Sequence, residues 1–314
     1  MLLHVIHETR YQYLRPVKTA QHMAHLKPAD GPLQRLLAHR LEVDPAPAQA
    51  GEAIDVYGNT RAFFSLQARH DELAVVARSL VDTVAPVVAD SAVAWEEVRE
   101  KMRYHRAADY DPAAEFVFAS PYVPRHADFL AYARPIFSAG RPVLEAASEL
   151  MQRINADFEY ETEATDATTP ALEAMQLRKG VCQDFAHVML GCLRSLGLPA
   201  RYVSGYLLTE PPPGKTRLVG SDASHAWVAV YIPGATAGAG WWANLDPTNN
   251  RAPGEDYVTV ATGRDYSDVS PLRGVLHGGA KHKLRVAVTV SPASAETQQD
   301  VTAPTMPDSN KELP

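Results

Sequence analysis

Apolar and polar positions alternate along the first 85 residues, as they do in strands that bury one face. Leu3, Val5 and His7 form one side of this alternation, and two tyrosines continue its period of two. Gly58-Asn59 separates two further runs of β-forming residues, which is typical of a hairpin turn. Several short strands at this spacing predict an antiparallel β-sandwich that forms an N-terminal domain over residues 1–85.

The pattern changes in residues 86–141, which we interpret as a mixed helical and proline-rich connector. Trp95, Val98 and Met102 lie at helical spacing and predict a short helix. The prolines that follow, from Pro112 onward, prevent the rest of the segment from forming one long element.

Residues 142–290 begin with three predicted helices and continue with strands. The first helix starts at Pro142, which suits a first turn, and its apolar residues recur three and four positions apart. The second helix follows Thr169-Pro170, and the third runs from about Val181 to Leu196. Four strand-like runs follow, at 200–208, 226–232, 240–245 and 283–290. Consecutive strands after helices predict an α+β fold in which helices pack on an antiparallel sheet.

Charge and composition limit the classes of partner. The chain has 314 residues and a formal net charge of −7, which argues against nucleic-acid binding because such binding needs a basic surface. No apolar run approaches the ~18 residues of a membrane helix, and the first residues do not resemble a secretory signal. Residues 291–314 are rich in proline and acidic residues, and we expect a disordered tail there. These features predict a soluble, cytoplasmic protein without a nucleic-acid or membrane partner.

The chain has only two cysteines, too few for a disulfide framework or a zinc site made of thiolates. Its paired histidines lack the spacing and the further ligands of a metal site. These pairs are His4 with His7, His22 with His25, and His277 with His282. We therefore expect no metal and no cofactor.

Cys182 follows Gly180 at the start of the third predicted helix. Backbone N–H groups and the helix dipole in a first turn favour a thiolate, and the same amides could bind an oxyanion. A cysteine on an apolar helix face can also be a small core residue. Cys192, later on the same helix, fits that second interpretation.

His225 lies at the entrance to one predicted strand, and Asp246 closes the next. If these two strands pair as a hairpin, the two side chains become neighbours. A thiol, an imidazole and an orienting carboxylate in that arrangement form a nucleophilic triad. Taken singly, His225 could be a surface residue at a strand edge and Asp246 a turn residue before Pro247.

Several segments together resemble the bacterial transglutaminase-like proteins, whose core is related to papain-like cysteine proteases. They are Gly180-Val-Cys-Gln-Asp-Phe-Ala-His187, Leu198-Pro-Ala-Arg-Tyr-Val-Ser-Gly-Tyr206, Ser224-His-Ala-Trp-Val228, Asp246-Pro-Thr-Asn249 and Gly263-Arg-Asp-Tyr-Ser-Asp-Val269. The opening segment His7-Glu-Thr-Arg-Tyr-Gln-Tyr13 is similar to the β-sandwich that these proteins carry before the catalytic domain. The resemblance covers the chain to about residue 290.

The resemblance implies roles for three residues: Cys182 as nucleophile, His225 as general base and acid, and Asp246 as the group that orients the imidazole. Gln183 is a candidate second oxyanion donor, or else a solvent-facing residue. Trp227 and Tyr206 are candidate cleft residues, although core packing explains the tryptophan equally well.

The implied activity is that of a cysteine peptidase or amidase that cleaves peptide or protein amides through a thioester. Two alternatives remain at this stage. One is a protein-glutamine transamidase, in which an amine replaces water. The other is a non-catalytic module that binds peptides. Animal transglutaminases have tryptophan where Gln183 stands here, which weakens the inference of cross-linking activity.

Overall fold

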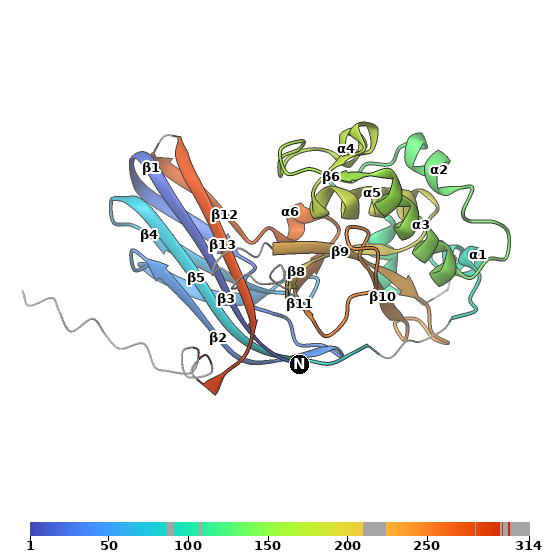
Figure 1. Ribbon diagram of the computed structural model, residues 1–314, viewed down its shortest axis with the longest axis horizontal. Coiled ribbons are helices and arrows are strands. Elements are labelled where there is room, and N and C mark those ends of the chain that lie inside the picture. Colours follow the sequence, from blue (N-terminus) through green and yellow to red (C-terminus); the bar gives the residue numbers. More distant parts are fainter. Residues whose placement is uncertain are drawn as a thin grey trace, which may run out of the picture.

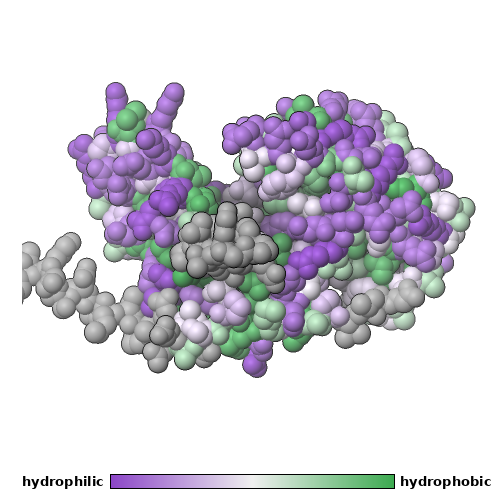
Figure 2. All heavy atoms as spheres, viewed as in Figure 1, coloured by the Kyte–Doolittle hydropathy of each residue, from purple (hydrophilic) through white to green (hydrophobic). Residues whose placement is uncertain are grey.

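The computed structural model describes residues 1–86, 91–106, 109–209, 224–279, 281–295, 297 and 301. A large β-sheet lies beside a smaller sheet that is covered by helices (Figure 1). In the same view, Figure 2 shows a notch between the upper ends of these two parts, which are joined below it. Within the described ranges, no helix is both long enough and apolar enough to cross a membrane.

The first part is a seven-stranded antiparallel sheet organised around the long strand β1 (Leu2–Ala24). Its other strands are β2 (Gln34–Asp44), β3 (Gln49–Ile54), β4 (Thr60–Leu66), β5 (His70–Thr83), β12 (Leu272–Gly278) and β13 (His282–Pro292). The first half of β1 lies between β5 and β13, and its second half lies between β4 and β12. The strands β2 and β3 pair with β5 and β4, respectively.

The two halves of this sheet pack on each other as the layers of a sandwich do. Tyr13 of β1, Phe64 of β4, and Leu73 and Val75 of β5 belong to one buried cluster. Because β4 and β5 pair with opposite halves of β1, a core shared between them requires these halves to face each other. The predicted antiparallel, strand-rich N-terminal region is thus confirmed.

Two strands of this sheet come from the other end of the chain. We assign residues 142–290 to one domain from the sequence, whereas the structure pairs β12 and β13 with β1. The strand β13 also continues to Pro292, so the first residues of the expected tail, 291–314, belong to a strand. Alternation along a strand indicates which face is buried but not which strand is its partner. Residues 302–314 lie outside the described residues.

The second part contains a four-stranded antiparallel sheet with the order β10-β9-β8-β11. Its strands are β8 (Ala200–Leu207), β9 (Ser224–Ile232), β10 (Trp241–Leu245) and β11 (Tyr257–Gly263). The helices are α1 (Trp95–Lys101), the 3₁₀ helix η1 (Pro112–Val117), α2 (Ala127–Ala133), α3 (Val143–Asp157), α4 (Ala171–Leu177), α5 (Cys182–Ser195) and α6 (Tyr266–Val269). A short parallel pair joins β6 (Glu159–Tyr160) to β7 (Lys179–Gly180). The helices of this part confirm the predicted α+β class.

The helix α5 is the centre of this second part. It packs against β8 and β9 on one side and against α2, α3 and α4 on the other. The segment 86–141 contributes to the same core, because Trp95, Phe129 and Phe137 are buried within it. The segment expected to be a connector therefore packs as part of the helical layer, to which it contributes α1, η1 and α2.

The cores of the two parts are continuous. Leu3 and Val5 of β1, Val81 of β5 and Val288 of β13 lie in the same buried cluster as α5. One face of the large sheet is therefore covered by the second part, and the two parts bury apolar surface between them.

Candidate active site

The chain places Cys182 at the first position of α5, after a tight turn. Gly180 has φ +154, and a Cβ there would lie 2.4 Å from the Oδ2 atom of Asp184. That carboxylate accepts hydrogen bonds from the Val181 N–H (2.8 Å) and from the Thr165 hydroxyl (2.6 Å). This cap fixes the first turn of α5, so its leading amides point towards the region around the sulfur.

Strand pairing brings His225 and Asp246 together. His225 is the second residue of β9, and Asp246 directly follows β10, which is antiparallel to β9. The Nε2 atom of His225 lies 2.6 Å from Oδ2 of Asp246. The Cys182 side chain is a further hydrogen-bond partner of His225, and its sulfur lies 4.0 Å from the Ser224 carbonyl oxygen. The three side chains therefore converge, with Nε2 facing the carboxylate and the opposite ring nitrogen left for the thiol.

The charges at this site reinforce one another. Burial alone would lower the pKa of His225, but its hydrogen bonds to Asp246 and Cys182 raise that pKa to about 10. Burial acts to raise the pKa of Asp246, yet the hydrogen bonds from His225, Asn249 and Tyr257 hold it below its ordinary value. At neutral pH the pair is therefore an imidazolium and a carboxylate.

Asp246 is fully buried, and every hydrogen bond that it accepts holds its carboxylate in place. The Tyr257 hydroxyl and the Asn249 side-chain amide each donate to Oδ2 at 2.8 Å. The N–H groups of Thr248 and Asn249 donate to Oδ1 at 2.9 and 3.2 Å. Sequence reasoning missed Tyr257, because nothing in its local pattern points to Asp246. Asn249 could have been found, since it lies in the turn that Asp246 begins.

Trp227 forms the wall behind His225 and is not part of an open cleft. It is 1% exposed, and its ring lies 6.1 Å from that of His225 and 5.4 Å from that of Tyr257. Gly205 of β8 lies opposite His225, and a Cβ there would come within 2.6 Å of the indole. The glycine in the segment 198–206 thus makes room for the ring that supports His225.

The other candidates lie elsewhere. The Gln183 amide donates to the Ala167 carbonyl (3.1 Å), so in this structure it is not directed at the sulfur. Tyr206 is 3% exposed, and its hydroxyl is hydrogen-bonded to Nδ1 of His7 (3.0 Å) at the junction with β1. Tyr160, by contrast, is 54% exposed, and partial burial together with the charge of Cys182 raises its pKa. Tyr160 is thus an exposed aromatic side chain within electrostatic range of the thiol.

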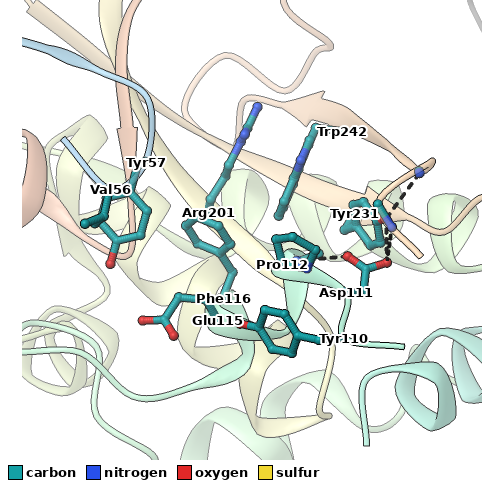
Figure 3. A pocket seen from close by; sticks show the side chains of 13 residues that line it. Val56, Tyr57, Tyr110, Asp111, Pro112, Glu115, Phe116, Arg201, Tyr231 and Trp242 are labelled. Carbon is teal, nitrogen blue, oxygen red and sulfur yellow. Dashed lines mark hydrogen bonds between the residues drawn. The ribbon is translucent and has the colours of Figure 1, made fainter. Parts of the chain in front are cut away.

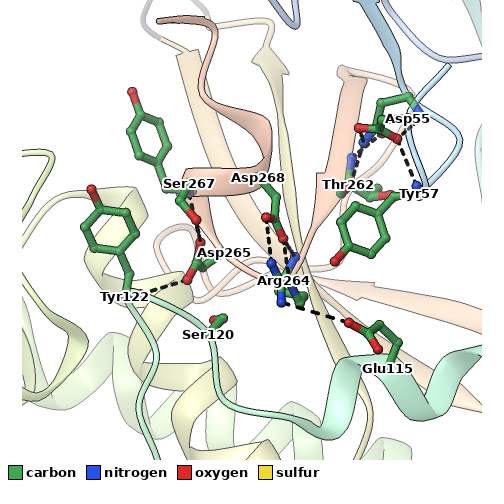
Figure 4. Close-up of polar contacts among 12 residues, drawn as sticks. Asp55, Tyr57, Glu115, Ser120, Tyr122, Thr262, Arg264, Asp265, Ser267 and Asp268 are labelled. Atoms are coloured by element: carbon green, nitrogen blue, oxygen red, sulfur yellow. Dashed lines mark hydrogen bonds and ion pairs between the residues drawn. The ribbon is translucent and has the colours of Figure 1, made fainter. Parts of the chain in front are cut away.

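A polar network fixes the chain that follows β11 (Figure 4). Arg264 forms a two-point contact with Asp268, at 2.9 and 3.1 Å, and lies 4.0 Å from Glu115 of η1. Asp265 accepts a hydrogen bond from the Tyr122 N–H at 2.8 Å. These bonds use the charged residues of the segment 263–269 to secure the end of β11, the strand that carries Tyr257.

In the part of the chain that the structure describes, no three histidine, cysteine or acidic side chains are grouped as metal ligands. The thiol, imidazole and carboxylate around Cys182 are groups of nucleophilic and acid–base chemistry.

Two family profiles match the chain. The bacterial transglutaminase-like N-terminal region matches residues 3–82, and the transglutaminase-like superfamily matches residues 130–247. An uncharacterised protein of Mycobacterium tuberculosis is 38% identical over 296 residues, which cover 92% of each chain. The protein-glutamine gamma-glutamyltransferase of Pseudomonas aeruginosa is 36% identical over 108 residues, or 33% of this chain and 15% of that protein.

The fold has a counterpart of known structure. A proposed cysteine protease from Cytophaga hutchinsonii superimposes with a TM-score of 0.69 at 21% identity, over 94% of this chain and 92% of the other. That similarity extends over both parts of the molecule. The two profile matches and the relative that is 38% identical over most of the chain show that the chain belongs to the transglutaminase-like superfamily and carries the bacterial N-terminal region of that family.

Proposed function

We propose that the protein is a cysteine amidase or peptidase that cleaves peptide or protein amides through a Cys182–His225–Asp246 triad. The observation that carries this proposal is the 2.6 Å contact between His225 and Asp246, with the Cys182 side chain as the other partner of the imidazole. A cationic imidazole beside the sulfur stabilises a thiolate, which is the nucleophilic form of cysteine.

The chemistry proceeds in two steps. The sulfur of Cys182 attacks the amide carbonyl carbon, and backbone N–H groups in the first turn of α5 stabilise the oxyanion. The C–N bond then breaks as His225 gives its proton to the leaving amine, which produces a thioester. In the second step, water attacks the thioester carbon, His225 accepts a proton from that water, and the thiolate of Cys182 is released.

Transamidation is the second candidate, and it differs only in the acceptor. It is favoured by one observation, the 36% identity to a protein-glutamine gamma-glutamyltransferase over part of the catalytic region. A primary amine would then attack the thioester in place of water. A peptide-binding module without turnover is less well supported, because all three side chains of a triad are present and in contact.

The test uses full-length protein with a library of glutamine-containing peptides, with and without a lysine-like primary amine. Hydrolysis releases a carboxylate product in water alone, whereas transamidation gives an amine adduct that mass spectrometry detects. Cys182→Ala should abolish either reaction, and Cys192→Ala is the matched control because Cys192 is fully buried in α5. Turnover that survives in Cys182→Ala would refute the proposal.

A further inference from the structure

A cavity lies against the small sheet and is lined by residues other than those of the proposed triad (Figure 3). It has a volume of about 540 Å³, within the usual range for small-molecule sites. Tyr231 lines it from β9, six residues beyond His225, so at about 3.3 Å per residue the two are ~20 Å apart. Tyr57 lines the other side and comes from the turn between β3 and β4. Both parts of the molecule therefore build this cavity.

The walls of the cavity are largely aromatic. Phe116 of η1 packs edge-on against Trp242 of β10, with ring centroids 5.3 Å apart, and lies 5.4 Å from the ring of Tyr57. Tyr231 lies 5.1 Å from Trp242. Tyr110 is 71% exposed and stands at the rim. Such walls suit a ligand with a flat apolar body.

Arg201 of β8 is the cation of this cavity. Its guanidinium stacks on Trp242, with the central carbon 4.3 Å from the ring centroid. The Nε atom is buried, and no group in the described ranges accepts a hydrogen bond from it. Burial is the physical cause that lowers the pKa of Arg201 to about 10. A buried N–H donor without an acceptor is costly, and a ligand oxygen in the cavity would supply the partner that the described chain does not.

The acidic groups around the cavity are already occupied. The carboxylate of Asp111 accepts hydrogen bonds from the Ala113 N–H (3.0 Å), the Tyr231 hydroxyl (2.8 Å) and the Gly238 N–H (3.2 Å). Glu115 faces the guanidinium of Arg264 at 4.0 Å, as Figure 4 also shows. The acceptor atoms of Asp111 are therefore engaged within the described chain, whereas the buried Nε donor of Arg201 is not.

We propose that this cavity binds a small organic carboxylate with a flat apolar body. The carboxylate would meet the guanidinium of Arg201, whose planar fork matches two oxygens, and the body would pack between the aromatic walls. A free aromatic acid and the C-terminal phenylalanine of a peptide share this chemistry.

Titration calorimetry on the full-length protein distinguishes a free aromatic acid from a peptide C-terminus. It also tests whether binding requires the negative charge of the ligand. Phenylacetate and N-acetylphenylalanine represent the free acid and the peptide end, and N-acetylphenylalanine amide is the uncharged control. We expect at least one of the acids to bind and the amide to bind far more weakly. Equal binding of acid and amide, or no binding of any acid, would overturn the proposal.

Substitutions then locate the site. Arg201→Met should weaken binding of the acid ~10–100-fold, the range for a lost charge-assisted hydrogen bond. Arg201→Lys keeps the positive charge but loses the planar fork, so its affinity for the acid should lie between those of the wild type and Arg201→Met. Arg99→Met is the matched control, because Arg99 stacks on Trp95 (4.8 Å) outside the cavity. Unchanged affinity in a folded Arg201→Met variant would refute the site. If Arg201→Met does not fold, binding of the acid is measured instead in Arg201→Lys and Tyr110→Ala. Unchanged affinity in both of these variants would likewise refute the site.

Discussion

The two cysteines occupy the same helix but very different surroundings. Cys182 begins α5 beside His225, whereas Cys192 is fully buried and burial raises the pKa of its thiol. We therefore expect iodoacetamide to alkylate Cys182 at least about tenfold faster than Cys192 at neutral pH, since the thiolate is the reactive form. Peptide mass spectrometry after brief exposure measures both sites. Equal labelling, or preference for Cys192, would contradict the proposed nucleophile.

Asp246 stabilises the charge on His225, and this gives its substitution a defined signature. In Asp246→Asn the amide can still hold the ring but cannot stabilise an imidazolium, so the pKa of His225 should fall from about 10. The upper limb of the pH profile of kcat/KM, which reports loss of the imidazolium proton, should therefore shift to lower pH. We expect kcat/KM to fall by about 10–10³, less than the ~10⁴ of the serine triad used for comparison. An unchanged rate and profile would make Asp246 a turn residue only.

The three residues of the proposed triad could be singled out because each carries a local signal: a helix start at Cys182, and strand ends at His225 and Asp246. Tyr257 could not, because its contact with Asp246 depends on where β11 lies in the sheet. The hydrogen-bond partner of Tyr206 could not be predicted for a related reason. The alternation of the sequence places Tyr206 on β8. The hydrogen-bond partner of its hydroxyl is His7, which comes from β1, a strand remote in sequence.

At the scale of elements, two side-chain amides take the place of a missing strand beside β11. The strand β11 lies at the end of the four-stranded sheet, so one of its edges has no neighbouring strand in the described chain. There the Gln34 side-chain amide donates to the Thr259 carbonyl oxygen and accepts from the Thr259 N–H, both at 2.7 Å. Asn59 does the same with Thr262 at 2.8 Å. An amide presents a donor and an acceptor as a peptide group does, so the N-terminal sheet completes the edge that carries Tyr257.

This arrangement predicts that Gln34 acts on the triad through Tyr257. Tyr257→Phe removes a donor that holds the Asp246 carboxylate against His225, so the upper limb of the kcat/KM profile should move to lower pH. Gln34→Leu should cause a smaller shift in the same direction, because it frees the backbone of β11. In the Tyr257→Phe background, Gln34→Leu should add no further shift, whereas a purely structural effect would appear in both backgrounds.

The matched control for that cycle is Gln12→Leu. Gln12 lies on β1 and is exposed, with its amide 3.5 Å from Glu72, so the same substitution there should leave the profile in place. Equal shifts from Gln12→Leu and Gln34→Leu would mean that the profile reports general destabilisation.

At the scale of the molecule, the chain closes on itself in a way that no local pattern reveals. The alternation in 283–290 predicts a strand, but the pairing of β13 with the first half of β1 joins opposite ends of the chain. Such pairings depend on burial in the finished fold. The α+β class and the N-terminal strands could be predicted because alternation and helical spacing act locally. The pairing of β12 and β13 with β1 could not.

The folded molecule also buries histidines in neutral form, which makes its stability depend on pH. Burial lowers the pKa of His7, His22 and His187 to about 4, and the charge of His70 contributes at His22. Unfolded histidine titrates near 6.5, so between pH 6.5 and 4 the unfolded chain binds more protons than the folded chain. Stability from these residues is therefore present above pH 6.5 and is lost as the pH falls towards 4.

His22 isolates this effect, because both of its ring nitrogens are buried without a hydrogen-bond partner in the described chain. Its ring stacks on Phe64 with centroids 5.1 Å apart, so His22→Phe keeps an aromatic contact and removes the titration. Between pH 7.5 and 5.0 the wild type should lose on the order of 2 kcal/mol more stability than the variant. Urea unfolding at both pH values measures this, and any packing cost of the larger ring cancels in the difference. If wild type and variant lose the same amount over that interval, His22 is not the neutral buried base that its surroundings indicate.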